Sequence, residues 1–194
     1  MNVGFSYLQF HLAFLFPAVM LLLVTGFVSR TRITDTTARW TDGWRRYWAG
    51  VVIITVVALV YTTPWDNLLI ARGVWWYGDG RVAATIWLAP VEEYLFIVLQ
   101  SVLVSVWTFQ TAGPVVGGVR HSRLDRGVGA VAGLAVSVVG LAFLLGPQST
   151  YYMGAILLWA GPVLALQWAV GWRYLLCVRR RVAVGVVVPV GYLC

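Results

Sequence analysis

Long apolar segments alternate with short polar segments along the whole chain. Five segments are mostly apolar over about 20 residues or more, the length that a helix needs to cross a bilayer, and a sixth begins near the end. They cover residues 5–28, 47–65, 83–109, 128–146, 151–171 and 182–194. With 60% hydrophobic and 11% charged residues, the chain of 194 residues has too little polar surface for a water-soluble globule. The pattern predicts an all-α integral membrane protein with about six transmembrane helices.

The basic residues lie almost entirely on one side of the predicted spans. All 14 are arginines, and 12 of them follow the first, third and fifth spans, whereas Arg72 and Arg81 lie in the loops of the opposite side. Because arginine-rich short loops remain in the cytoplasm, this distribution predicts a multi-pass protein of the cell membrane with its N-terminus outside. The arginines that give the formal charge of +7 are expected to set the orientation of the protein in the membrane, and no nucleic-acid partner is expected.

The lysine, cysteine and histidine content excludes several classes of site. A retinal Schiff base requires a lysine, and the chain has none, so a retinal-binding opsin is excluded. Cys177 and Cys194 lack the spacing of a metal or redox motif, and His11 and His121 are far apart in sequence. No metal, disulfide or cofactor is therefore expected. His11, alone in the first span beside Gln9, is interpreted as a satisfied buried or interfacial group rather than a proton relay.

Two parts of the chain share a pattern that predicts an internal repeat. Tyr7 and Tyr152 each precede a proline by ten residues, and each span leads through an arginine-bearing loop into a valine-rich helix. A three-span unit reverses sides, so a second copy in the same orientation needs a linker helix. In that linker Gly129 and Gly133 have the small-residue spacing of close helix packing. The predicted domains are a first three-span repeat at 1–110, a cytoplasmic loop and linker helix at 111–150, and a second repeat starting at 151–194, which we expect to be truncated before its acidic site.

Three of the seven acidic residues are placed where an acid is costly. Asp66 is placed at the end of the second span, and Glu92 and Glu93 about eight residues into the third, all in the outer half of the bilayer. A carboxylate at the centre of a span costs about 2.5 to 3.5 kcal/mol, so these three are candidate functional residues. Burial favours the uncharged form, so at least one is expected to carry a proton. The other four acids are expected to be solvated in loops: Asp35, Asp42, Asp79 and Asp125.

Each of the three candidate acids also has a structural interpretation. Either glutamate can cap the start of its helix and pair with Arg72 or Arg81 from the preceding loop. Asp66 can lie among the lipid headgroups or begin a turn. The residues alone leave these interpretations open beside the functional one.

Aromatic side chains gather around the same acids. On a helix, Glu93, Phe96 and Gln100 share one face, which mixes an acid, a ring and an amide. Aromatic faces stabilise a cation by about 2 kcal/mol or more where no water solvates it. Such a site suits proton addition to an alkene, with the carbocation sheltered until it loses a proton. The expected substrate-binding residues are Trp65, Trp75, Trp76, Trp87, Tyr94, Phe96 and Gln100, and Tyr77 belongs to the same cluster.

Three stretches of the sequence carry a family resemblance. They are Pro90-Val91-Glu92-Glu93-Tyr94-Leu95-Phe96, Asp66-Asn67 through Gly73-Val74-Trp75, and Trp159 through Leu166-Gln167-Trp168. Together they resemble the heterodimer-type lycopene cyclases, small membrane proteins of bacteria, archaea and fungal fusion enzymes. The resemblance implies redox-neutral closure of the acyclic ψ end group of lycopene to a β-type ring, an isomerase or intramolecular lyase reaction of carotenoid biosynthesis. It implies Glu92 and Glu93 as catalytic acid and base, with Asp66 assisting, and no metal or flavin.

The resemblance also implies partners and leaves alternatives. The expected partners are a lipophilic carotenoid substrate, membrane lipid and, because a second acidic repeat is absent, a second cyclase subunit or a homo-oligomer. A non-catalytic carotenoid-binding or partner subunit of a split cyclase would use the aromatic cluster without proton exchange. A proton-coupled transporter half would need polar residues along several helices, and the first, fourth and fifth spans offer few. A membrane prenyltransferase would need aspartate-rich motifs for magnesium, and the sequence has none.

Overall fold

The computed structural model describes residues 6–31, 37–78, 80–111 and 122–193. The chain splits into two compact units, Met1–Thr111 and Ala112–Cys194, and each is described by itself. Several residues named in the sequence analysis lie outside the described residues: Asp35, Asp79, His121 and Cys194. The side chain of Asp42 is not described either.

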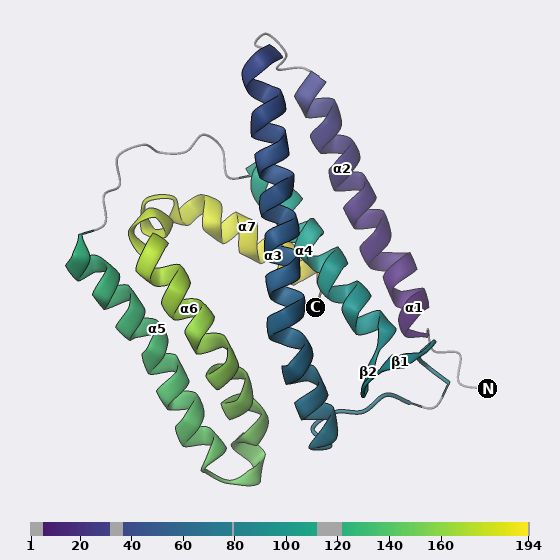
Figure 1. Cartoon of the computed structure of the whole chain (residues 1–194), viewed down its shortest axis with the longest axis vertical. Coiled ribbons are helices and arrows are strands. Elements are labelled where there is room, and N and C mark those ends of the chain that lie inside the picture. Colours follow the sequence, from purple (N-terminus) through teal and green to yellow (C-terminus); the bar gives the residue numbers. More distant parts are fainter. Residues whose placement is uncertain (1–5, 32–36, 79, 112–121, 194) are drawn as a thin grey trace. The chain divides into compact units, whose positions relative to one another are not determined.

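The first unit is built from three long helical segments and a small hairpin. The first segment consists of α1 (Tyr7–Phe10), the π-helical turn η1 (His11–Leu15) and α2 (Phe16–Thr31); the others are α3 (Thr37–Ala71) and α4 (Val91–Thr111). Ser6 caps the first segment, because its side chain accepts the Gln9 N–H while the Gln9 side chain accepts the Ser6 N–H. Helix α4 packs against α2, η1 and α3. Figure 1 shows β1 (Thr85–Ile86) and β2 (Ala89–Pro90) beside α1 and the start of α4.

The second unit is a tight helical hairpin followed by a shorter helix. Helix α5 (Arg123–Leu144) is joined by the short turn η2 (Gln148–Thr150) to α6 (Tyr151–Cys177), and α7 (Arg179–Leu193) follows. Glycines let the backbones of α5 and α6 touch, since a Cβ at Gly133 would overlap the backbone of Ala165 and one at Gly129 that of Trp168. The prediction that these two glycines serve close helix packing is confirmed.

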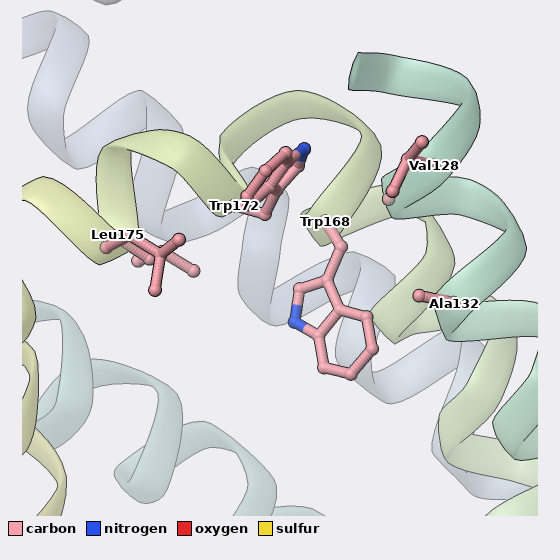
Figure 2. Close-up of a pocket in the computed structure, with 7 residues that line it drawn as sticks. Val128, Ala132, Trp168, Trp172 and Leu175 are labelled. Carbon is pink, nitrogen blue, oxygen red and sulfur yellow. The ribbon is translucent and has the colours of Figure 1, made fainter. Parts of the chain in front are cut away.

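An apolar pocket lies along the α5–α6 hairpin, as Figure 2 shows. It has a volume of about 310 Å³. Small residues on α5 leave space opposite the indoles of Trp168 and Trp172 on α6. The lining residues are Val128, Gly129, Ala132, Trp168, Trp172, Leu175 and Leu176.

The predicted fold class is confirmed. Within the described ranges five helices are long and apolar enough to cross a membrane: Tyr7–Gly26, Arg45–Ala71, Val91–Gln110, Arg123–Leu144 and Gln148–Cys177. The sixth predicted span corresponds to α7, whose 15 residues fall short of the about 20 that a bilayer crossing needs. The internal repeat and the orientation stay predictions.

The boundaries of the second and third predicted spans were wrong at the ends that carry the acids. The segment before Pro90 does not belong to the third helix but forms an antiparallel hairpin, in which Thr85 pairs with Pro90 and Ile86 with Ala89. Proline has no N–H to donate and readily precedes or opens a helix, so α4 begins at Val91. Glu92 and Glu93 therefore lie in the first turn of α4 rather than eight residues into it. Helix α3, conversely, continues past the predicted end at residue 65 to Ala71.

Asp125 was wrongly predicted to be a solvated loop acid. It is buried in the first turn of α5, where it forms a capping box with Ser122. One carboxylate oxygen also pairs with the Arg173 guanidinium at 2.7 Å, and the Trp172 indole N–H donates to its backbone carbonyl at 3.0 Å. Asp125 thus fastens the start of α5 to the end of α6.

Candidate active site

The three candidate acids come together at one end of the first unit. Asp66 lies near the end of α3, whereas Glu92 and Glu93 lie in the first turn of α4. Asp66 and Glu93 are close enough to interact electrostatically. Asp66 and Glu92 are buried, with Glu92 only 2% exposed. The fold therefore concentrates carboxyl groups in a place that water reaches poorly.

The two oxygens of Glu92 have different surroundings. The backbone N–H of Ala83, in the loop before the hairpin, donates to Oε1 at 2.7 Å. The other oxygen, Oε2, is buried and has no hydrogen-bond partner among the described residues. Glu92 thus holds the loop before the hairpin through one oxygen. The interpretations of Glu92 as a helix cap and as a partner of Arg72 or Arg81 stay predictions.

Glu93 interacts with two tyrosines, one of which donates a hydrogen bond to it. The Tyr77 hydroxyl, from the loop after α3, donates to Glu93 Oε1 at 2.5 Å. Tyr7 lies close enough to this carboxylate to interact with it electrostatically, and the two phenol rings stack with their centroids 5.9 Å apart. Burial raises the pKa of Tyr77 above its ordinary value, and the hydrogen bond and negative charge of Glu93 raise it further. Tyr77 therefore stays neutral and acts as the donor.

His11 is fully buried beside this cluster. Its Nδ1 lies 2.7 Å from the Tyr7 carbonyl oxygen, which only accepts, so Nδ1 donates this hydrogen bond. Nε2 has no hydrogen-bond partner among the described residues. The ring meets Phe96 edge-on at a centroid distance of 5.8 Å. The prediction that His11 is buried is confirmed, but the prediction that it is satisfied is wrong for Nε2.

Asn67 is a site residue that the sequence analysis did not single out. Its Oδ1 accepts the backbone N–H groups of Leu88 at 2.8 Å and Ala89 at 3.2 Å, while its amide donates to the Thr63 carbonyl at 2.8 Å. These bonds hold the turn of the hairpin, where Trp87 has a φ of 57°. A positive φ at a bulky residue costs on the order of 1 to 3 kcal/mol and persists only when its surroundings fix it. Asn67 thereby fixes the hairpin that precedes Glu92.

Replacing Asn67 with alanine is expected to destabilise the protein by about 2 to 4 kcal/mol, because two backbone N–H groups lose a buried acceptor. The measurement is the thermal unfolding midpoint in detergent, together with protease cleavage at residues 80–90. Leu68→Ala is the matched control, since Leu68 is exposed on the same turn of α3. Equal midpoints for the two variants would show that Asn67 does not hold the hairpin.

The predicted substrate-binding residues differ in their exposure. Phe96 contacts His11, and Trp65 and Trp75 are half-buried. Trp76 and Trp87 are 80% and 72% exposed. Tyr94 donates to the carbonyl of Ile86 in the hairpin at 3.0 Å. Gln100 is half-buried, and its Oε1 has no hydrogen-bond partner among the described residues. Binding of a substrate by these residues stays a prediction.

The arrangement has the groups needed to move a proton in an apolar site. Glu92 offers a carboxyl oxygen with no hydrogen-bond partner in the described residues, whereas Glu93 accepts a hydrogen bond from the Tyr77 hydroxyl. Among the described residues, no group of three or more histidines, cysteines and acids is placed to hold a metal ion.

Comparison with known proteins gives relatives of one kind. Lycopene beta-cyclase of Halobacterium salinarum is 51% identical over 156 residues, which cover 80% of this chain and 65% of that protein. The bifunctional lycopene cyclase/phytoene synthase of Sporisorium reilianum is 32% identical over 83% of this chain and 22% of its own length. That of Arthroderma gypseum is 26% identical over 98% of this chain and 33% of its own length.

The comparisons with family models and with solved structures add no further relatives. No family model matches the chain, and no solved structure matches it. The chain spans 65% of the length of its archaeal relative. The sequence similarity covers most of this chain, and the chain belongs to the lycopene cyclase family.

Proposed function

We propose that this chain provides the acidic site of a lycopene cyclase that closes the acyclic end group of a carotene to a β-type ring. A carboxyl proton adds to the terminal double bond and leaves a tertiary carbocation. The π electrons of the next suitable double bond attack this cation, which forms the ring bond and moves the positive charge to a ring carbon. Loss of a neighbouring C–H proton to a carboxylate then gives the ring alkene. The product is an isomer of the substrate, so no oxidant or reductant is consumed.

Glu92 acts as the proton donor in this proposal. A proton on its Oε2 meets no acceptor among the described residues, so it is available to a substrate alkene. Its other oxygen is occupied by the Ala83 amide, which fixes the direction of the carboxyl group. This single observation carries the proposal: a carboxyl 2% exposed is held by one oxygen and left without a partner at the other.

Glu93 acts as the base, and Asp66 assists it. The Tyr77 hydroxyl donates to one oxygen of Glu93 and holds its carboxyl group in place, and as the base this group accepts the proton from the ring cation. Asp66 lies close enough to interact with Glu93 electrostatically, so its carboxyl group adds to the polar surroundings of that cation. Phe96 and the half-buried Trp65 and Trp75 supply the apolar, aromatic surroundings in which the carbocation survives.

The protein that performs the reaction can contain more than this chain. Because the chain spans 65% of its archaeal relative, we include in the proposal a second cyclase subunit or a second copy of the chain. We also propose that the protein lies in the cell membrane with its N-terminus outside, since 12 of 14 arginines lie in the loops of the other side.

Pigment analysis of a lycopene-accumulating bacterial host tests the proposal. The host would express this chain alone, or together with a chain that supplies a second acidic repeat. Cyclic carotenes from either strain support the cyclase. Lycopene unchanged in both strains, with the protein confirmed in the membrane, would instead favour a non-catalytic carotenoid-binding or partner subunit.

A further inference from the structure

We propose that the stacked pair Tyr7 and Tyr77 positions Glu93 and thereby determines where the double bond of the product ring forms. The inference rests on the proposed function. It assigns to both tyrosines a positioning role, in which they act on the substrate only through the carboxylate. The residues come from α1 and from the loop between α3 and β1, about 70 residues apart in a chain of 194.

Tyr77 holds Glu93 from one side through a short bond. Its hydroxyl lies 2.5 Å from Oε1, within the range of charge-assisted O–H···O⁻ bonds, which are about twice as strong as neutral ones. A carboxylate bound in this way has one preferred rotation about its last torsion. Without the bond the torsion is broad, as is usual for the terminal group of a glutamate.

Tyr7 restricts the movement of the Tyr77 side chain. The Tyr7 ring stacks on Tyr77 at 5.9 Å and packs edge-on against the His11 ring at 4.7 Å, so it lies between two aromatic groups. Its backbone N–H donates to the Arg81 carbonyl at 2.9 Å, which ties α1 to the loop before the hairpin. The tyrosine pair is therefore fixed by packing and by the backbone, as a positioning group must be.

The last step of the cyclisation is sensitive to this position. Three different carbons next to the ring cation carry removable protons, and their loss gives the β, ε or γ ring from one common cation. These carbons lie within a few ångströms of each other, and a base misplaced by about 1 Å loses much of its rate toward one of them. A carboxylate held in one orientation by the Tyr77 hydroxyl can select one proton, whereas a rotating carboxylate removes several.

The test uses the form of the cyclase that gives cyclic product in the lycopene-accumulating host, with Tyr77→Phe and Tyr7→Leu as separate variants. Phenylalanine at position 77 keeps the ring stack and removes only the hydroxyl, whereas leucine at position 7 removes the ring that stacks on Tyr77. Tyr61→Phe is the matched control, because Tyr61 is an exposed tyrosine of α3 in the same unit. The readout is the ratio of β, ε and γ rings in the product, measured beside the amount of folded protein in the membrane.

We expect Tyr77→Phe to increase the share of minor ring isomers about tenfold, Tyr7→Leu to change it in the same direction, and Tyr61→Phe to leave it unchanged. An unchanged isomer ratio in the two folded variants overturns the inference and leaves the cyclase intact, even if total product falls. Complete loss of product from folded Tyr77→Phe also overturns it, since the hydroxyl would then take part in the chemistry itself. No cyclic product from the unsubstituted protein overturns both proposals together.

Discussion

Glu92→Gln is expected to reduce cyclic carotene formation by about 10² to 10⁴, the range that one general acid contributes. Glutamine keeps the side-chain oxygen that accepts the Ala83 amide, so the loop before the hairpin stays in place. It cannot give a proton to an alkene. The variant therefore separates the chemical role of Glu92 from its structural role, and the measurement is the rate of cyclic carotene formation per amount of folded protein.

Two further variants control this experiment. Glu93→Gln removes the proposed base, and the double variant should be little worse than the more severe single one, because residues that act as one unit are not additive. The thermal unfolding midpoint of Glu92→Gln should stay near that of the unsubstituted protein. A folded Glu92→Gln protein that keeps more than about a tenth of the activity would contradict the assignment of Glu92 as the proton donor.

The helices and the grouping of the acids could be predicted from the sequence. A membrane-spanning helix satisfies its own backbone and needs only an apolar run of sufficient length, so local composition was enough to place five of them. The convergence of Asp66 with Glu93 follows from two consecutive helices whose connecting segment, residues 72–90, begins and ends on the same side of the membrane. Neither inference required knowledge of contacts between distant segments.

The hairpin and the hydrogen bonds from Asn67 that hold it could not be predicted from the sequence, because they depend on contacts that no local pattern shows. Thr85 and Ile86 extend an apolar run, and nothing near them marks a turn except Pro90. The turn places Trp87 at a positive φ, where glycine or asparagine would have been the usual signal. Asn67 lies 20 residues before Trp87 in the sequence, and its side chain accepts hydrogen bonds from the backbone amides of this turn. No pattern near the turn indicates this contact.

The bond from the Tyr77 hydroxyl to Glu93 could not be predicted for a similar reason. The burial and capping role of Asp125, in contrast, were missed although a local sequence pattern indicates them. Tyr77 was placed in the aromatic cluster, but its bond to Glu93 depends on how the loop after α3 returns to α4. Ser122 and Asp125 stand three residues apart at the start of an apolar run. That spacing is the pattern of a capping box and predicts a helix start.

Gly133→Leu is expected to give the largest loss of stability in the second unit, because the backbones of α5 and α6 are in contact there. A Cβ at Gly133 would already overlap the backbone nitrogen and Cα of Ala165. Backbone atoms cannot turn away as the end of a flexible side chain can, so the two helices must separate along their length. Overpacking typically costs 1 to 3 kcal/mol and occasionally more, and we expect a loss of about 3 kcal/mol here.

Gly127→Leu is the matched control for this variant on the same helix. A Cβ at Gly127 meets no atom within 4 Å, so the same added side chain should change the unfolding midpoint little. The measurement is the thermal unfolding midpoint of each variant in detergent, followed by near-ultraviolet dichroism of the tryptophans that line the pocket between α5 and α6. Similar midpoints for Gly133→Leu and Gly127→Leu would show that α5 and α6 are not held at the close separation that the glycines allow.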